Sequence, residues 1–306
     1  MSDVILHHYP PSLFSEKIRL LLGYCGVPWR SVIIPPIMPR PLLMPLTGGY
    51  RKTPVMQIGA DIYCDSKIIA ERIAELAGRQ DLLAGFVAQR LGEWADTQLF
   101  RVVVAVTFQP RAIVATMSRL STTEMQAFQK DRAELARGGS ITTYTPEVAE
   151  GFLDHYLTEL EATLSTDFLL GRTPTIADFC VYHCFWLVTN NPVTAPLVTK
   201  HAKVAAWMQR MAAFGHGKVA EITGEEALAI AKAAEPARST VTEVHLPVGY
   251  SLGQGVAVTP TDYGLVPVRG KLVVCSSREV AIGRRDDAAG NIVVHFPRPG
   301  FAITVG

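Results

Sequence analysis

The chain has 306 residues, enough for two domains or for one domain with a large appendage, and a core of that size needs no disulfides to stabilise it. Hydrophobic residues make up 48% of the chain and charged residues 19%, a composition that excludes a disordered polar protein. The formal net charge of +1 argues against a protein that coats polyanions, so we expect neither nucleic acid nor an anionic membrane as a partner.

The cysteines and the first residues indicate a cytoplasmic protein. The five cysteines are odd in number and form no CxxC pair, which favours reduced intracellular thiols over a disulfide framework. Residues 1–9 lack a basic segment followed by an apolar one, so we expect no secretion signal. Apolar stretches such as 179–188 are too short to cross a bilayer.

Residues 4 to about 77 alternate between short β-rich runs and one-sided helical runs, which is typical of an α/β domain. Five prolines between residues 35 and 45 exclude a long helix there, because proline lacks the backbone donor. The pattern predicts strands at 4–9, 29–34, 53–58 and 61–64, and helices at 14–23 and 65–77.

Residues 85–234 show helical patterns without a convincing strand. The first predicted helix covers about 87–117, with Pro110 as a kink. Thr175 and Asp178 match a capping box, in which two otherwise unpaired backbone donors at a helix start are satisfied. Further helices are predicted at 122–137, 146–164, 175–189, 204–214 and 225–234.

From about residue 239 the chain is rich in Gly, Pro and β-branched residues, which predicts five or six short strands with a tight hairpin at 287–291. We therefore expect an α/β domain at 1–83, an all-α helical bundle domain at 84–236 and a small all-β module at 237–306. The simplest role for the β module is to cover an edge or a helical face, or to widen an oligomer interface. Contact with a substrate or partner is the alternative.

Three features of the first domain are expected to meet at one edge of a thioredoxin-like sheet, with βαβ followed by ββα: the turn before Ser12, the Thr53-Pro54 pair and the Asp65-Ser66 pair. A proline at the start of a strand often follows a cis bond, and such a turn offers the backbone of Thr53 to an extended peptide. The helix start at Asp65 offers amides to a carboxylate, and the Asp65 side chain can hold an ammonium. The combination predicts a receptor for a short peptide with a free α-amino-acid end.

With these motifs in this order, the chain resembles the cytosolic glutathione S-transferases over about residues 4–214. The segment 12–20 (SLFSEKIRL) is similar to the first-helix motif of that family, 52–59 (KTPVMQIG) to its cis-proline strand, and 63–66 (YCDS) to its γ-glutamyl-binding motif. The segment 175–178 (TIAD) is similar to the capping box of its helical domain. The resemblance implies a thioredoxin-like domain that binds glutathione and a helical domain that forms the electrophile pocket, in a cytoplasmic homodimer concerned with detoxification.

The resemblance also assigns roles to individual residues. The backbone of Thr53 before Pro54 would bind the cysteinyl part of glutathione, and Asp65 and Ser66 its γ-glutamyl end. Lys52, with Arg51 as a further candidate, would meet the glycine carboxylate.

The catalytic hydroxyl implied by the same resemblance is that of Ser12, with Ser15 and Tyr9 as alternatives because a short gap in the loop would change the alignment. A thiol with a pKa of about 8.5 must fall by roughly 2 units to be mostly thiolate at neutral pH, which takes about 1.4 kcal/mol per unit. A hydrogen bond to the charged sulfur supplies about 1.5 to 3 kcal/mol and a helix N-terminus about 0.3 to 1. The sum of the two contributions is sufficient, so no catalytic base is required.

Aromatic and sulfur-bearing side chains give further candidates. Phe14, Trp94 and Phe108 are candidates to line the apolar electrophile pocket, although an aromatic stripe on a helix is more often core. Cys180, His183 and Cys184 fall within about one helical turn, but no fourth ligand accompanies them, so a buried core helix is favoured and no metal is expected.

The main functional hypothesis is that glutathione, held as a thiolate by the serine, attacks a small and largely apolar electrophile. A second hypothesis is a non-catalytic glutathione-binding or regulatory protein, whose β module recruits a partner. A third is a glutathione-dependent isomerase or lyase.

Overall fold

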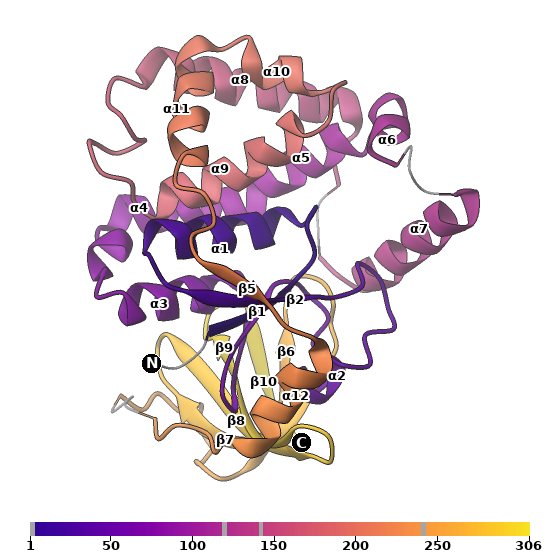
Figure 1. Ribbon diagram of the computed structural model, residues 1–306, viewed down its shortest axis with the longest axis vertical. Coiled ribbons are helices and arrows are strands. Elements are labelled where there is room, and N and C mark those ends of the chain that lie inside the picture. Colours follow the sequence, from indigo (N-terminus) through magenta and orange to yellow (C-terminus); the bar gives the residue numbers. More distant parts are fainter. Residues whose placement is uncertain (1–3, 118–120, 141–142, 240–242) are drawn as a thin grey trace.

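The computed structural model describes residues 4–117, 121–140, 143–239 and 243–306. A thioredoxin-like α/β domain lies in the middle of the molecule in Figure 1, with the helical bundle above it and the C-terminal strands below it. None of the described helices has both the length and the apolar character needed to span a membrane.

The first elements follow the predicted order, because the short β-rich runs and the amphipathic runs are separated by Gly and Pro turns. The short helix in the proline-rich segment was not predicted, and it begins at Met44 with a proline in its first turn, where the missing donor costs nothing. The elements are β1 (Val4–His8), α1 (Leu13–Tyr24), β2 (Trp29–Ile33), α2 (Met44–Thr47), β3 (Val55–Ile58), β4 (Asp61–Cys64), α3 (Ser66–Leu76) and the 3-10 turn η1 (Gln80–Leu83).

The helical part departs from prediction between residues 86 and 117, where one kinked helix was expected. A π-helical turn interrupts the segment. The helix then ends before Phe108 and Gln109, and Pro110 starts a new helix. The helices are α4 (Phe86–Trp94), the π-helical η2 (Ala95–Leu99), α5 (Phe100–Thr107), α6 (Pro110–Met117), α7 (Thr122–Ala136), α8 (Pro146–Thr163), α9 (Ile176–Thr189), α10 (Ala195–Thr199) and α11 (Ala202–Ala212).

The predicted capping box at the start of α9 is confirmed. The Asp178 carboxylate accepts from the backbone N–H of Thr175 at 2.8 Å and from that of Leu169 at 2.8 Å. It also accepts from the indole N–H of Trp207 at 3.1 Å. One buried carboxylate thus holds a helix start, the preceding loop and α11 together.

The expectation of no strand between residues 85 and 234 is wrong. The strand β5 (Val219–Glu221) pairs in parallel with β2, and α12 (Gly224–Ala233) follows it and contacts β2, β9 and α2. Three residues of mixed polarity carry almost no strand signal of their own, so the neighbouring strand decides their conformation.

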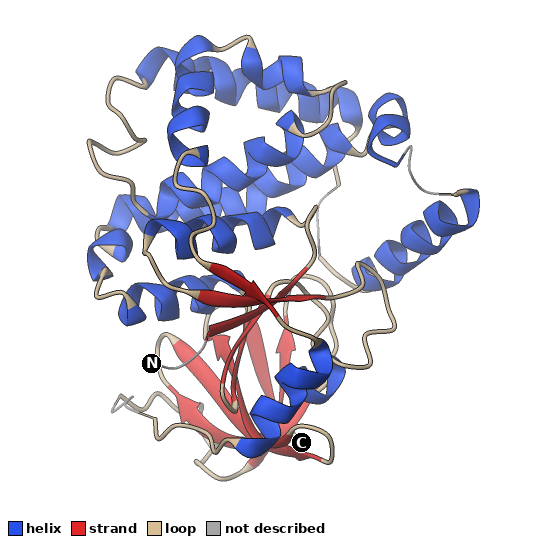
Figure 2. Cartoon of the chain, viewed as in Figure 1, coloured by secondary structure: helices blue, strands red, loops and turns tan. Residues whose placement is uncertain are grey.

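The C-terminal strands join the thioredoxin-like sheet instead of forming a separate one. Strand β9 (Gly290–Pro297) pairs in parallel with β4, and the predicted hairpin at 287–291 connects it to β8 (Glu279–Asp286). The remaining strands are β6 (Gly255–Pro260), β7 (Val268–Cys275) and β10 (Phe301–Val305), which agrees with the five or six strands predicted. Among the described residues, ten strands form one sheet in the order β10-β6-β7-β8-β9-β4-β3-β1-β2-β5, seen as the red layer of Figure 2.

The two faces of the thioredoxin-like part of this sheet, β1 to β4, pack into two different hydrophobic cores. Along β1, Val4 and Leu6 pack with α1, α3 and the helical bundle, whereas Ile5 packs with the C-terminal strands. Likewise Met56 of β3 faces the helices, and Val55 faces the C-terminal strands. Successive side chains of a strand point to opposite faces, so continuous apolar runs in these strands reflect burial on both sides. The C-terminal strands therefore provide the second wall of the thioredoxin-like core.

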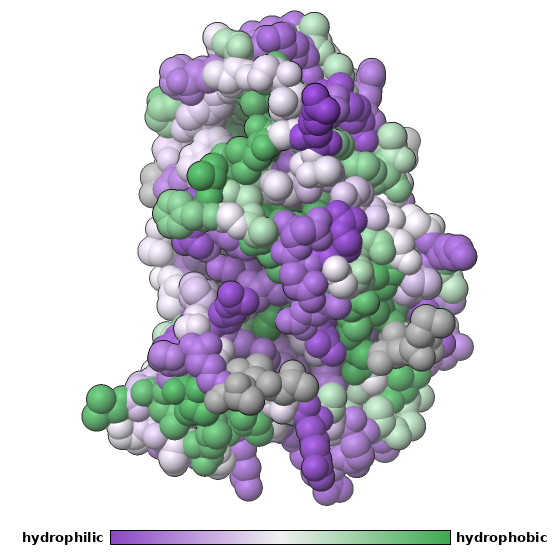
Figure 3. Space-filling model, turned by 90° about the vertical axis from the view of Figure 1, so that its left-hand side faces the viewer, coloured by the Kyte–Doolittle hydropathy of each residue, from purple (hydrophilic) through white to green (hydrophobic). Residues whose placement is uncertain are grey.

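The surface carries apolar side chains at several separate places. On the face shown in Figure 3, green areas are divided by hydrophilic ones. Phe86 and Val87 at the start of α4 are exposed, as is Val248 in the segment before β6. Singly exposed apolar residues are ordinary on protein surfaces and do not by themselves indicate an interface.

Candidate functional site

The sheet register brings the predicted site residues to one end of the sheet. His7 of β1 pairs with Val55 of β3, and Val55 pairs with Cys64 of β4. Because β1 and β4 both run antiparallel to β3, the residues after β1, before β3 and after β4 share that end. Tyr9 to Ser12, Thr53-Pro54 and Asp65-Ser66 occupy these three positions, as the sequence predicted.

Ser12 caps the N-terminus of α1 and is 5% exposed. Its hydroxyl oxygen accepts from the hydroxyl of Ser15 at 2.9 Å and from the Ser15 backbone N–H at 3.3 Å. A hydroxyl has one donor and two lone pairs, so accepting two bonds leaves the Ser12 O–H to donate. Ser15 is fully buried, and its hydrogen bonds hold the Ser12 hydroxyl in place.

A buried ion pair holds the turn that precedes Ser12. Arg19 pairs with Glu16 at 2.7 Å, one helical turn apart on α1, and donates to the backbone oxygen of Pro10 at 2.9 Å. Arg19 also lies 3.0 Å from Nδ1 of His8, and Glu16 lies 3.0 Å from Nε2 of His216. Burial and the Arg19 charge lower the pKa of His8 to about 3, so this histidine is neutral. The carboxylate of Glu16 is thus engaged by Arg19 and His216 at the start of α1.

The peptide bond between Thr53 and Pro54 is cis. The Thr53 hydroxyl accepts from Arg40 at 3.0 Å. Within the described part of the chain, the backbone N–H and C=O of Thr53 have no hydrogen-bond partner. These two groups stand at the start of β3, where an extended peptide can pair with them.

Asp65 has an unusual backbone conformation. Among the described residues it is the one non-glycine residue with a positive φ, 98°, a region that costs roughly 1–3 kcal/mol for a residue with a side chain. Its carboxylate caps α3 by accepting from the Lys67 N–H at 2.9 Å. Burial raises the pKa of Asp65, while the Lys52 charge and the Lys67 N–H act in the opposite direction. Ser66 opens α3 beside it and is buried.

The cations at the other end of the site are already paired. Lys52 lies 2.6 Å from Asp262, and Arg51 lies 2.7 Å from Asp131 of α7. Arg40 donates to the backbone oxygens of three residues as well as to Thr53; these are Pro35, Pro36 and Arg51. The carboxylates of Asp131 and Asp262 were not among the predicted residues, because both come from elements distant in sequence from the motifs.

The three aromatic candidates sit in separate ring pairs. Phe14 packs against Phe100 of α5, with ring centres 5.0 Å apart, and against His183 at 4.8 Å. Trp94 meets Tyr156 of α8 edge to face at 5.2 Å, and Phe108 stacks on Phe128 of α7 at 6.4 Å. Of the three, Phe14 is next to the Ser12 helix start.

Next to Phe14, a cluster of buried polar side chains joins α1 to the helical bundle. The Lys17 ammonium lies 2.6 Å from Asp96, which stands in the π-helical turn, and Nε2 of His183 lies 2.9 Å from the same carboxylate. Burial acts to raise the pKa of Asp96, but the Lys17 charge and the His183 hydrogen bond outweigh it and lower the value to about 2. Cys180 and Cys184 are buried in α9 beside this cluster, as the core-helix interpretation predicted.

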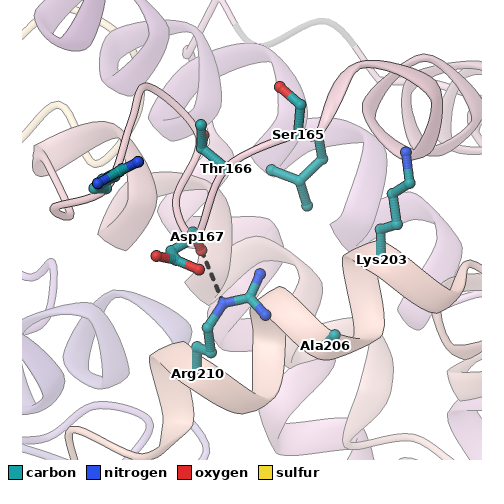
Figure 4. Close-up of a pocket in the computed structure, with 8 residues that line it drawn as sticks. Ser165, Thr166, Asp167, Lys203, Ala206 and Arg210 are labelled. Atoms are coloured by element: carbon teal, nitrogen blue, oxygen red, sulfur yellow. Dashed lines mark hydrogen bonds between the residues drawn. The ribbon is translucent and has the colours of Figure 1, made fainter.

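Two clefts of about 500 Å³ lie elsewhere on the molecule. The first, of about 530 Å³, is bounded by the loop before α9 and by α11, and Figure 4 shows the Arg210 side chain reaching the Asp167 backbone there. The second, of about 510 Å³, is formed by segments around His245 and Arg298. Neither cleft is lined by the predicted glutathione-site residues.

The family models of the glutathione S-transferase N-terminal domain and C-terminal domain match residues 6–81 and 148–210, respectively. The crystal structure of a GST-like protein from Pseudomonas syringae is 38% identical in sequence, covers 100% of both chains and superposes with a TM-score of 0.82. The chain belongs to the glutathione S-transferase family. No curated protein sequence matches it.

Two further solved structures match only part of the chain. Glutathione transferase F2 from Populus trichocarpa is 16% identical with a TM-score of 0.50, and the β-etherase LigF from Sphingobium sp. strain SYK-6 is 14% identical with a TM-score of 0.51. Each match covers 69% of this chain but 93% and 95%, respectively, of the other chain. At such identities the likeness shows the fold alone, and about a third of this glutathione S-transferase family member lies outside it.

Proposed function

We propose that the protein is a glutathione transferase, in which the Ser12 hydroxyl stabilises the glutathione thiolate for attack on a small, largely apolar electrophile. The observation that carries the proposal is the hydrogen bonding of Ser12, whose oxygen accepts two bonds from Ser15 and whose own proton remains to be donated. The hydroxyl stands at the N-terminus of a helix of 12 residues, where the helix dipole also favours an anion.

Glutathione is expected to lie along the edge that starts at Thr53. Its cysteinyl backbone would pair with the two unpartnered backbone groups of Thr53, which fixes the sulfur relative to Ser12. Its γ-glutamyl ammonium would meet Asp65 and its γ-glutamyl carboxylate the first amides of α3, at Ser66. The glycine carboxylate would lie toward Lys52 and Arg51.

The attack follows from this placement. The thiolate sulfur gives its electron pair to an electrophilic carbon, the new C–S bond forms, and the leaving group departs with its own pair. Phe14 is the first candidate to contact the electrophile, with Trp94 and Phe108 further along the helical domain. This division assigns glutathione binding to 1–83 and the electrophile to 84–236.

The decisive experiment combines retention on immobilised glutathione with an ultraviolet titration of the bound thiolate. Ser12→Ala is expected to raise the pKa of the bound thiol by about 1–2 units, because a hydrogen bond to a charged group contributes about 1.5–3 kcal/mol. Ser15→Ala is expected to raise it by less, and Ser251→Ala in an exposed loop serves as the control.

Each result has a different consequence. Binding without a thiolate at neutral pH would favour the non-catalytic glutathione-binding protein. An unchanged thiol pKa in Ser12→Ala would move the role to Tyr9 or Ser15, and absence of binding would refute all three hypotheses. An isomerase or lyase would show the same thiolate but consume a different substrate class.

The resemblance also supports a cytoplasmic homodimer with a role in detoxification, in which the helical domain supplies the interface. Light scattering of the full chain would test the dimer directly, since one subunit has a mass of 33.3 kDa.

A further inference from the structure

One loop of the C-terminal strands reaches the proposed glutathione site. The loop at 261–267 connects β6 to β7, and its Asp262 carboxylate lies 2.6 Å from the ammonium of Lys52. The same ammonium lies 4.1 Å from the centre of the Tyr263 ring. Because Lys52 directly precedes the cis Thr53-Pro54 pair, the loop contacts the residue assigned to the glycine end of glutathione.

Backbone hydrogen bonds anchor the loop at Asp262 itself and at Gly264. The backbone N–H of Gly264 donates to the oxygen of Leu135 at the end of α7 at 2.8 Å, and the oxygen of Asp262 accepts from Ser140 at 2.9 Å. Gly264 has a φ of 63°, and a Cβ there would lie 3.0 Å from the Leu135 side chain. A side chain at this φ would be strained and would press on Leu135, so glycine favours this close approach, which helps to place Asp262.

The positively charged side chains of Lys52 and its neighbours Arg51 and Arg40 all have partners within the protein. Arg51 is paired with Asp131, and Arg40 is satisfied by backbone oxygens and Thr53. The Lys52 side chain is 11% exposed, whereas that of Asp262 is 43% exposed. A ligand carboxylate that approaches Lys52 therefore meets the negative charge of Asp262, which repels it and already shares the same ammonium.

We propose that Asp262 is a specificity-determining residue, which competes with the terminal carboxylate of the thiol peptide for Lys52. Asp262 then weakens the binding of thiol peptides that end in a carboxylate. It does not weaken the binding of thiol peptides whose C-terminal end is neutral. This inference rests on the proposed function, because it requires Lys52 to face the glycine end of glutathione. It gives the C-terminal strands a part in ligand selection in addition to their part in the core.

The test is a comparison of two ligands on two proteins. Glutathione and its glycyl ethyl ester differ in the charge of the C-terminal end, and Asp262→Asn removes the competing charge at constant size. Isothermal titration of the full chain is expected to show glutathione binding about tenfold tighter in Asp262→Asn, with the ester unchanged. Asp286→Asn is the matched control, because Asp286 lies in the same strands beside Arg284 and away from Lys52.

A second variant separates this role from a structural one. In a Lys52→Gln background, Asp262→Asn is expected to leave glutathione affinity unchanged, because the contested ammonium is gone. Equal changes for both ligands, or an unchanged glutathione affinity in Asp262→Asn, would overturn the inference while leaving the proposed function standing. Failure of the wild type to bind either ligand would instead overturn the proposed function, and the inference with it.

Discussion

Two junctions tie the thioredoxin-like domain to the rest of the chain, and each contains a histidine that contacts carboxylate groups; His183 is buried and His295 is mostly buried. At the junction with the helical bundle, His183 shares Asp96 with Lys17. At the junction with the C-terminal strands, His295 of β9 lies 3.0 Å from Asp61 of β4 and 2.5 Å from Glu279 of β8.

Burial acts to lower the pKa of both histidines, but the net shifts are opposite. Burial lowers the pKa of His183 and outweighs the attraction of Asp96, whose charge is already balanced by Lys17. Burial also acts to lower the pKa of His295, but the hydrogen bonds to Asp61 and Glu279 outweigh it and raise the value. The comparison teaches that the net charge of the neighbours, and not burial alone, decides the direction in which the pKa of an enclosed histidine shifts.

The largest expected effect is at the helical junction. Asp96→Asn leaves the Lys17 ammonium, which is 1% exposed, without a countercharge and is expected to cost about 3–5 kcal/mol of unfolding free energy, measured by urea denaturation. Adding Lys17→Met should recover most of the loss, because an apolar replacement removes the unpaired charge. Asp154→Asn, which removes an exposed partner of Lys200, is the control and should cause no measurable loss. Equal losses in the two single variants would contradict this account.

At the strand junction, His295→Gln is expected to cost about 1.5–3 kcal/mol near pH 6, because it removes a charged donor to two carboxylates. A raised folded pKa stabilises the folded state fully below the unfolded pKa of about 6.5, and that contribution is lost as the pH rises through the folded pKa. The difference between wild type and variant should therefore shrink toward pH 9 in urea unfolding. A difference between wild type and variant that stays constant over this pH range would argue against a charged His295.

The smallest expected effect is that of His183→Gln, which keeps a donor for Asp96 and removes the buried Nδ1 that has no partner among the described residues. At pH 7 the change should be within about 1 kcal/mol. Since the folded pKa is lowered, the unfolded chain binds a proton below about pH 6.5 before the folded chain does, and wild-type stability falls there. Thermal unfolding between pH 7 and 5 should show a shallower fall in the variant; a steeper one would contradict the neutral His183.

The sequence predicted the elements whose pattern is local. Strands β1 to β4, the starts of α1 and α3 and the capping box of α9 follow from periodicity, prolines and capping residues within a few positions. Strand β5 was missed because its pairing with β2 gives it a conformation that its own three residues do not indicate. The break before α6 was only partly predicted, since Pro110 indicates a kink but not the π-helical turn upstream.

The sequence by itself determined the order of the three parts of the chain. It also determined that Ser12, Thr53-Pro54 and Asp65-Ser66 lie at one end of the sheet, because short local motifs specify the turns and helix starts at these positions. Only the tertiary structure decided that β9 extends the sheet at β4, and that Asp131 and Asp262 meet Arg51 and Lys52. Those contacts join residues separated by 80 and 210 positions, and no local propensity encodes such a pairing. These contacts form only when the helical bundle and the C-terminal strands pack on the thioredoxin-like domain and bury both faces of its strands.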